Sequence, residues 1–437
     1  MDALEQSSTL WEVVIAVSIF LSTYAIVISE KINRAIIALA GALLMILFGL
    51  VDIHTAYTKH IEWETLFLLI GMMILVGITN RSGLFQYIAI KAAQRAKGDP
   101  VKILVTLALL TAVGSAFIDN VTTVLLIVPI TFSITKLLKL NPIPFLITEI
   151  IVCNIGGAAT LIGDPPNIMI GTAADLSFNQ FLVTMTPIVI VILVVVMFYL
   201  KWLYGRQLVV NEMDKAQLMK IDPRSFIKDA ALMKKSLFVF ALTIIGFLVH
   251  RFFHIEPAVI AFSGATLLML IGTKEHDLEE VFHSVEWVTI FFFAGLFVLV
   301  GGLIEVGVIG QLASAVVNVT EGDIALTSIL ILWVAGIASA LIDNIPLVAT
   351  MIPMVMEMGV QLDVPNETLH PIWWSLALGA CLGGNGTLIA SSANLIVAGI
   401  SAREGTRISF IEFLKIGMPI TLISMAMATV YVYLVLL

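Results

Sequence analysis

Apolar residues recur along the chain in runs that are long enough to cross a lipid bilayer as helices. About 20 helical residues cover the roughly 30 Å of hydrocarbon in a membrane. Ten such runs occur, near residues 11–29, 35–51, 64–80, 143–174, 181–201, 236–250, 257–273, 286–304, 371–399 and 410–436. They predict an all-α polytopic membrane protein with about ten transmembrane helices.

Two further apolar stretches have the pattern of helical hairpins that enter the membrane and return to the same side. The first, residues 101–138, is bounded by Lys102 and Lys136. Each arm has about 16 residues, or about 24 Å of helix, which is short for a full crossing. We therefore expect a re-entrant hairpin here, with two full crossings as the alternative, and its counterpart at about 324–359. A polar tip inside the bilayer must be buried in protein or line a cavity.

The composition agrees with a membrane protein and removes several other classes. The 437 residues are 59% hydrophobic and 12% charged. A mean hydropathy of +1.05 excludes a soluble globular domain. Asp2 and Glu5 precede the first run without Lys or Arg, so we do not expect this run to be a secretory signal peptide. Cys153 and Cys381 lie in apolar segments and indicate neither a disulfide framework nor a zinc site.

The distribution of Lys and Arg predicts the orientation in the membrane. Placing the N-terminus outside puts 21 of the 23 basic residues on the cytoplasmic side, with only Lys59 and Arg251 outside. The positive-inside rule therefore predicts a multi-pass protein of the cytoplasmic (inner or plasma) membrane with both termini outside. The hydrophilic linker 205–235 carries seven Lys/Arg against four Asp/Glu and belongs on the cytoplasmic face.

The second half of the chain repeats the first. The matched segments are 62–89 with 286–313, 114–130 with 338–354, and 156–167 with 383–394, at offsets of 224, 224 and 227. Each half contains five crossings, an odd number, so the second copy must enter the membrane from the opposite side. We therefore predict two inverted repeats, 1–204 and 236–437, joined by the linker 205–235. This arrangement is characteristic of secondary transporters with sites near the midplane.

Each hairpin is followed by a span with a polar interruption in its middle. In the first half the interruption reads GGAATLIGDPPN (156–167), and two consecutive prolines cannot occupy a helix interior. In the second half it reads GGNGTLIASSAN (383–394), where glycine, serine and asparagine favour unwinding. Broken helices leave free N–H groups at one end and free carbonyls at the other, and together these can hold an anion and a cation.

Three aspartates fall on these tips and breaks, namely Asp119, Asp164 and Asp343. A carboxylate inside the bilayer costs at least about 2.5–3.5 kcal/mol on insertion scales, so these groups need a cation, a proton or hydrogen-bond donors. Capping of the following helices is the structural alternative. Asp164 aligns with Ser391, so the two halves of the site differ chemically. Glu149 is either a proton relay or a side chain that reaches back to the cytoplasmic interface.

The motifs SAFIDNVTTVLLIVPI, NIGGAATLIGDPPNIMI and SALIDNIPLVATMIPM resemble those of the ArsB/NhaD permeases of the ion transporter superfamily. That group holds arsenite efflux proteins, sodium/proton antiporters and the melanosomal P protein, and more distantly citrate and dicarboxylate carriers. The resemblance covers nearly the full length and implies two opposed hairpins, an elevator-like movement and often a dimer. Asp before Asn at both tips departs from the Ser-Asn-Thr of dicarboxylate carriers, which makes a dicarboxylate a less favoured substrate.

The resemblance and the repeat together give a set of expected substrate-binding and ion-binding residues. In the first half they are Ser115, Asp119, Asn120, Thr122, Thr123, Asn154, Gly156, Gly157, Thr160, Asp164 and Asn167. In the second half they are Ser339, Asp343, Asn344, Gly384, Asn385, Thr387, Ser391 and Asn394. No resident metal or cofactor is expected; the coupling ion is H⁺ or Na⁺, and sodium would bind at the hairpin tips.

We therefore predict an ion-coupled secondary transporter, not an enzyme, that moves a small inorganic solute such as an arsenite-like oxyacid or another anion. The alternatives are a sodium/proton antiporter and a citrate or dicarboxylate carrier. An intramembrane aspartyl protease is less favoured because the chain lacks a GxGD block, and a passive channel because inverted repeats are typical of carriers. No P-loop occurs. The expected partners are the solute, the lipid bilayer and a second copy of the chain. No nucleic acid is expected, and association with a partner ATPase is an open alternative.

Overall fold

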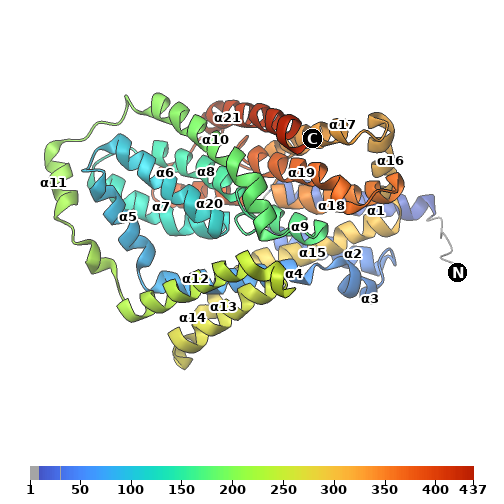
Figure 1. The fold of residues 1–437 in the computed structure, drawn as a ribbon, viewed down its shortest axis with the longest axis horizontal. Helices are drawn as coiled ribbons and strands as arrows, with labels where there is room; N and C mark the ends of the chain where they lie inside the picture. Colours follow the sequence, from blue (N-terminus) through green and yellow to red (C-terminus); the bar gives the residue numbers. More distant parts are fainter. Residues whose placement is uncertain (1–8, 30) are drawn as a thin grey trace.

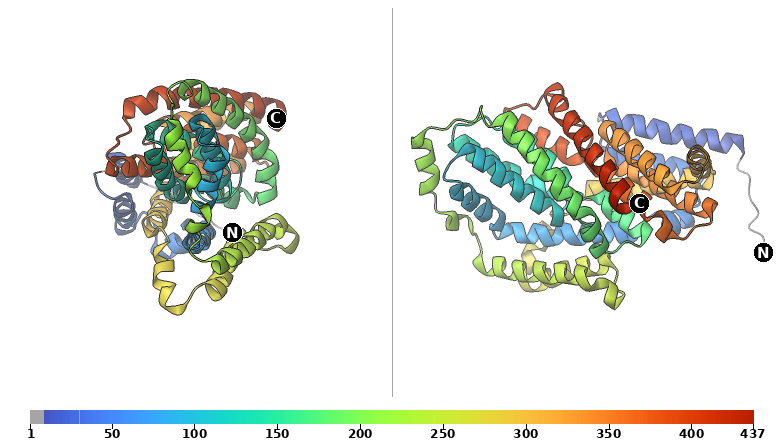
Figure 2. Two further views of the ribbon diagram at one scale, coloured as in Figure 1. Left: turned by 90° about the vertical axis from the view of Figure 1, so that its left-hand side faces the viewer. Right: turned by 45° about the horizontal axis from the view of Figure 1, so that its top comes forward.

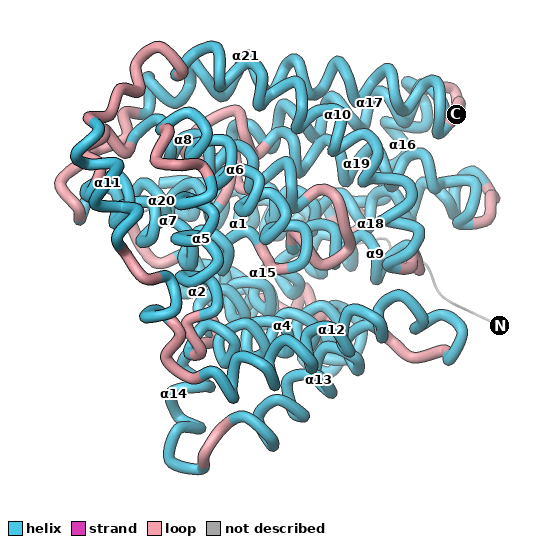
Figure 3. The backbone as a smooth tube through the Cα atoms, turned by 60° about the vertical axis from the view of Figure 1, so that its left-hand side comes forward, coloured by secondary structure: helices cyan, strands magenta, loops and turns pink. Residues whose placement is uncertain are grey.

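The computed structural model describes residues 9–29 and 31–437, and this part of the chain is helical and without strands (Figure 3). Asp2 and Glu5, on which the expectation about a signal peptide depends, lie outside the described residues. The first half contains α1 (Leu10–Ser29), α2 (Arg34–Leu47), α3 (Ile53–Thr55), α4 (Trp63–Arg81), α5 (Leu84–Arg95), α6 (Pro100–Phe117), α7 (Asn120–Leu137), α8 (Ile143–Gly157), α9 (Pro165–Ala174) and α10 (Phe178–Tyr204).

The same order of elements recurs after a connecting segment that holds α11 (Glu212–Lys220). The second half contains α12 (Ala230–Phe253), α13 (Pro257–Gly272), α14 (Leu278–His283), α15 (Trp287–Glu305), α16 (Val308–Thr320), α17 (Ile324–Leu341), α18 (Asn344–Leu362), α19 (His370–Gly383), α20 (Ser392–Arg403) and α21 (Phe410–Tyr431). Short 3-10 or π turns occupy Ala56–His60, Pro223–Phe226, Glu275–Asp277, Asn366–Leu369 and Val432–Leu436. That the two halves enter the membrane from opposite sides stays a prediction.

Ten helices of the described chain are long and apolar enough to cross a membrane: α1, α4, α6, α7, α10, α12, α15, α17, α18, and α21 with its continuation to Leu436. The predicted fold class is therefore confirmed, although these ten are not the ten predicted runs. All four hairpin arms, α6, α7, α17 and α18, are among the helices long enough to cross, with 18 or 19 residues each. By contrast, α2 and α13 have only 14 and 16 residues.

The prediction of about 16 residues per hairpin arm is wrong for two local reasons. Asp99 caps α6 ahead of Lys102, because its side chain accepts hydrogen bonds from the first-turn N–H groups, and Pro100 occupies the first position. The turn between the arms takes only Ile118 and Asp119. α12 begins at Ala230, inside the predicted linker 205–235, because Asp229 caps it there.

Six helices form one bundle, here named the scaffold bundle: α1, α2, α4, α12, α13 and α15. In it α13 crosses α4 and α2 crosses α15, each at a glycine. A Cβ at Gly71 would lie 2.8 Å from the Ala261 backbone, and a Cβ at Gly295 would lie 2.7 Å from the Ala38 backbone. Only glycine permits such an approach, so matched glycines of the repeat fix two equivalent crossings. α12 and α13 run along the lower side of Figure 1.

The hairpins, the broken helices and the long helices α10 and α21 form a second bundle, here named the core bundle (α6–α10 and α17–α21). Within each half, α6 packs along α8 and α17 packs along α19. Between the halves, α7 contacts α20 and α18 contacts α9. Each hairpin therefore touches the broken helix of the other half, and in the right-hand view of Figure 2 α10 and α21 cross the front of the bundle.

Candidate functional site

Each hairpin turns at an aspartate that caps its second arm. The Asp119 carboxylate accepts a hydrogen bond from the Thr122 N–H at 2.9 Å, and the Asp343 carboxylate accepts one from the Ile345 N–H at 3.1 Å. The buried hydroxyl of Thr123 donates back to the Ile118 carbonyl at 3.2 Å, which tightens the first tip. The capping role considered for these two aspartates is therefore real, and each carboxylate keeps an oxygen for other partners.

Both predicted helix breaks are present, and the same asparagine contacts hold each loop. α8 ends before the loop and α9 resumes with both prolines in its first turn, where proline is tolerated. The Asn167 side-chain amide donates to the carbonyls of Gly157 and Thr160, at 3.2 and 3.0 Å. In the second half, Asn394 donates to Gly384 at 2.8 Å and to Thr387 at 3.1 Å. The second loop thus keeps its shape without a proline.

Serine and threonine hydroxyls tie each hairpin to the broken helix of its own half. Ser115 donates to the Cys153 carbonyl at 2.7 Å, and Ser339 donates to the Ala380 carbonyl at 2.6 Å. Thr387 donates to the Ala340 carbonyl at 2.7 Å, and Thr160 donates to the carbonyl of Ala116 in the same way. The Ser115 hydroxyl also contacts the side-chain oxygen of Asn120. These four predicted site residues therefore hold the hairpins on the broken helices and position the site.

Gly156 and Gly157 belong to the same docking contact. A Cβ at Gly156 would lie 2.2 Å from the Ala112 carbonyl oxygen, and a Cβ at Gly157 would lie 2.3 Å from the Asn120 side-chain oxygen. Real Cβ contacts are not that short. The two glycines therefore let the hairpin approach the broken helix.

Asn154 is the polar centre at which the two halves meet, and it is 1% exposed. Its amide nitrogen lies 3.0 Å from the side-chain oxygens of both Asn385 and Asn394 and 3.3 Å from the Gly384 carbonyl. Its oxygen accepts from Ser391 at 3.2 Å and from Asn120 at 3.4 Å. Asn154 and five other predicted residues, from both repeats, are thereby brought to one buried point.

Asp164 occupies the N-cap position of α9, but its side chain makes no capping hydrogen bond. It is 2% exposed, and one carboxylate oxygen accepts from the Asn344 amide of the opposite hairpin tip at 3.2 Å. The capping alternative is therefore wrong for Asp164. Its carboxylate instead joins the break of one half to the tip of the other.

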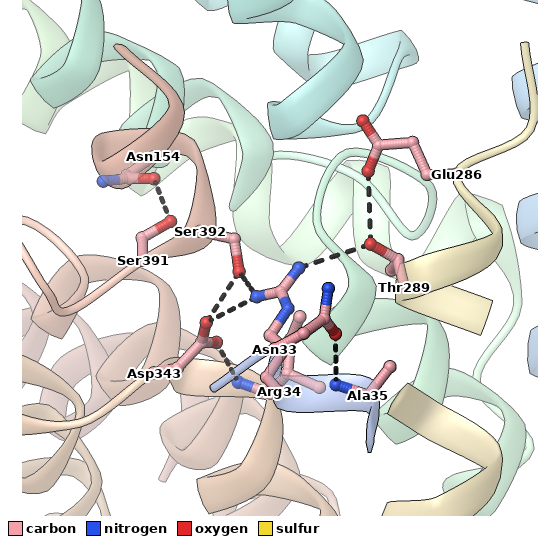
Figure 4. Close-up of polar contacts among 10 residues, drawn as sticks. Asn33, Arg34, Ala35, Asn154, Glu286, Thr289, Asp343, Ser391 and Ser392 are labelled. Atoms are coloured by element: carbon pink, nitrogen blue, oxygen red, sulfur yellow. Dashed lines mark hydrogen bonds and ion pairs between the residues drawn. The ribbon is translucent and has the colours of Figure 1, made fainter. Parts of the chain in front are cut away.

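Arg34 is a site residue that the sequence interpretation missed. It lies at the start of α2 in the scaffold bundle, and one guanidinium nitrogen lies 3.2 Å from the Asp343 carboxylate (Figure 4). The same nitrogen donates to the Ser392 hydroxyl, which itself donates to Asp343 at 2.6 Å. A second nitrogen donates to Thr289 at 3.3 Å, and Thr289 donates to Glu286 at 3.2 Å. A cation of the scaffold bundle thus faces the tip of the second hairpin.

A cavity of about 300 Å³ opens beside this ion pair. Its lining includes Lys31 from the connection before α2, Arg34 from the start of α2, Asp343 from the hairpin tip, and Ser392 from the start of α20. One sequence signal could have identified Arg34: α13, the equivalent of α2 in the second half, begins with Pro257, so this cation has no counterpart at the start of α13. In the described chain no group of three or more His, Cys, Asp or Glu side chains could hold a metal ion.

Comparison with known proteins identifies the family. Residues 24–379 match the family model CitMHS, described as citrate transporter. The chain belongs to this family of membrane transporters. It is 42% identical over 425 residues to an uncharacterized transporter of Mycobacterium tuberculosis, covering 96% of this chain and 98% of the relative. It is likewise 42% identical over 424 residues to a 46 kDa membrane protein of Mycobacterium leprae, covering 96% and 98%.

A more distant relative and one solved structure extend the comparison. The human P protein is 33% identical over 500 residues, which cover 96% of this chain and 59% of that protein. The crystal structure of the Alcanivorax borkumensis YdaH transporter has the same fold, with a TM-score of 0.61, 14% identity, and coverage of 96% and 97%. The expected transporter superfamily and the likeness to the P protein are confirmed. Placement among the ArsB/NhaD permeases stays a prediction, and the citrate description belongs to a group that we expected to be more distant.

Proposed function

We propose that this transporter is an ion-coupled secondary carrier of a small anion, an arsenite-like oxyacid or a carboxylate, that works by an elevator-type movement. The observation that carries the proposal is the Arg34–Asp343 ion pair, which joins the scaffold bundle to the core bundle at the edge of a cavity. The site residues of both repeats belong to the core bundle, whereas Arg34 belongs to the scaffold bundle. Movement of the core bundle along the scaffold bundle would therefore break this pair.

The chemistry around Arg34 favours an anion. Among the described residues that line the cavity are two cationic side chains, Arg34 and Lys31, and one carboxylate, that of Asp343. The N-terminus of α20 adds backbone N–H groups, because Ser391 at its N-cap makes no side-chain capping bond. Helix N-termini and a guanidinium both stabilise carboxylates and oxyanions. A bound anion would replace Asp343 as the partner of Arg34.

An uptake screen in proteoliposomes tests this proposal. Radiolabelled arsenite, citrate, chloride and sodium are supplied under imposed proton gradients. We expect uptake of one of the anions, and at least a tenfold lower uptake in Arg34→Gln. A tenfold change corresponds to about the free energy of one charge-assisted hydrogen bond. Arg403→Gln is the matched control, because this exposed arginine at the end of α20 does not line the cavity and the variant removes the same charge without breaking the ion pair.

The same screen separates the remaining candidates. Citrate uptake would agree with the description of the family. Sodium exchange without uptake of any anion, at the same rate in Arg34→Gln as in the wild type, would reject the anion carrier in favour of a sodium/proton antiporter. We further propose that the protein lies in the cytoplasmic membrane with both termini outside, which the charge distribution supports. The resemblance to the ArsB/NhaD permeases is the basis for proposing a homodimer as well.

A further inference from the structure

We propose that Glu149 is the proton-binding site that couples this transporter to a proton gradient. The inference rests on the proposed function and names its coupling ion. Glu149 lies on α8, the broken helix that also carries Asn154. Its coupling role follows from its burial, its missing hydrogen-bond partner and its counterpart in the second repeat.

The carboxyl group of Glu149 is buried and only half satisfied. The residue is 1% exposed, so the alternative that it reaches back to the membrane interface is wrong. One carboxyl oxygen accepts a hydrogen bond from the Thr131 hydroxyl of α7. The other oxygen is buried and has no hydrogen-bond partner in the described chain. A carboxylate in this position lacks the partners that would stabilise its charge.

No cation of the elements packed against α8 reaches Glu149. The basic groups on these elements are Lys102 on α6, Lys136 on α7, Lys201 on α10, His370 on α19 and Arg403 on α20, and none of them forms an ion pair with Glu149. The other titratable groups nearby are acidic or neutral: Asp119 at the tip, Asp164 in the break, Tyr199 and Tyr204 on α10, and the thiols Cys153 and Cys381. The buried carboxyl must therefore be neutral or hold a small cation.

The surroundings fit a proton better than sodium. A sodium ion in a transporter is held by several oxygen ligands, including unwound backbone carbonyls. Glu149 lies inside continuous helix, and Thr131 is the one polar side chain that contacts its carboxyl group in the described chain. A proton needs no ligand cage. It neutralises the carboxyl group directly, and its loss leaves a charge that the closed interface between α7 and α8 does not stabilise.

The second repeat shows that packing alone does not require this carboxyl group. The positions equivalent to Thr131 and Glu149 are Val355 and Leu376, both 0% exposed. Two apolar side chains thus fill the matching interface between α18 and α19. The buried carboxyl group of Glu149 and its partner Thr131 therefore occur in the first repeat alone. A buried carboxyl group lowers the stability of the fold, so a residue with a purely structural role is expected to be apolar here, as in the second repeat.

Glu149 also lies next to the polar centre. It precedes Cys153 by one helical turn, and the Cys153 carbonyl accepts the hydrogen bond of Ser115 that holds the hairpin tip. One turn further along α7, the Thr135 hydroxyl donates to the Thr131 carbonyl at 2.8 Å. Thr131 and Thr135 thus place polar groups between Glu149 and the base of the hairpin. Gain or loss of a proton at Glu149 therefore changes the charge at the contact between the hairpin and the broken helix.

Infrared spectroscopy on the full-length protein in lipid tests the inference without any substrate. We expect a protonated carboxyl band that disappears as the pH is raised within the range where the protein stays folded, and that is absent in Glu149→Gln. The exposed Glu412→Gln is the matched control and should leave the band unchanged. If Glu149→Gln does not fold, the pair Thr131→Val with Glu149→Leu, which copies the second repeat, replaces it.

The outcomes separate this inference from the proposed function. A band that persists in the Glu149 variants, or one that is lost in them but never titrates in the wild type, would overturn the proton site. A titrating band that is lost in the variants supports it, and uptake of labelled citrate or arsenite by Glu149→Gln should then no longer respond to an imposed proton gradient. A titrating band in a protein that transports neither anion would overturn the proposed function and leave the proton site in place.

Discussion

Three aspartates that look alike in the sequence have different surroundings in the structure. Asp119 caps α7 and has no ion pair in the described chain. Asp343 caps α18 and also pairs with Arg34. Asp164 caps nothing and accepts a hydrogen bond from Asn344 of the other repeat. Equivalent positions in the two repeats are thus electrostatically unequal.

Replacing Asp164 with serine tests its role at the site. Serine is a competent helix cap, so a capping residue would tolerate the change. Because Asp164 binds Asn344 instead, we expect transport to fall about tenfold, which corresponds to about 1.4 kcal/mol, and its pH profile to shift. The measurement is initial uptake in proteoliposomes as a function of pH.

Asp99→Ser is the matched control, because Asp99 does cap its helix, with two hydrogen bonds of 3.0 Å to first-turn N–H groups. This variant should keep both the rate and the pH profile. A wild-type profile in Asp164→Ser as well would remove Asp164 from the site.

At the scale of elements, the docking of each hairpin on a broken helix depends on glycines. Gly156 meets the Ala112 carbonyl of α6, and its counterpart Gly383 meets the Gly336 carbonyl of α17, where added Cβ atoms would lie at 2.2 and 2.5 Å. Both contacts are with backbone atoms, which cannot move aside as a flexible side chain can. The hairpins are therefore placed by close backbone contact, and the serine and threonine hydroxyls fix their register.

Gly156→Ala should destabilise the protein by about 1–3 kcal/mol, the usual cost of overpacking, and lower its melting temperature. The control is Gly399→Ala in α20, where a Cβ would meet nothing within 4 Å. There the helix propensity of alanine should raise stability by up to about 1 kcal/mol. Thermal unfolding of the two purified variants in detergent compares them directly, and equal melting temperatures would show that the hairpin contact is not a constraint.

At the scale of the whole molecule, the opposite insertion of the two repeats is open to direct measurement. Single cysteines are placed in a background without Cys153 and Cys381, both 0% exposed. We expect a cysteine at Met213, which is 79% exposed, to react with an impermeant reagent only from the cytoplasm, and one at the exposed Glu367 only from outside. Labelling in the reverse pattern, or of both positions from one side, would contradict the inverted arrangement.

The sequence alone determined most of the local architecture. Helical spans, the two hairpins, both polar interruptions and the paired Asp-Asn tips follow from hydropathy, from proline and glycine, and from the repeat, because each of these is a property of neighbouring residues. The same local signals made the hairpin arms slightly too short and placed the start of α12 too late, since the caps at Asp99 and Asp229 extend the helices beyond the apolar runs.

Only the tertiary structure decided which polar groups meet. The role of Asn154 as the centre of both halves depends on the contact between α8 and the second break, which lies 230 to 240 residues further along the chain. The sequence interpretation assigned Arg34 to the cytoplasmic side by its charge, but its partner Asp343 is 309 residues away. Whether Glu149 reaches solvent likewise depends on α7 packing over it. Pairings across such separations are set by how the bundles pack, and a single sequence carries no local pattern for them.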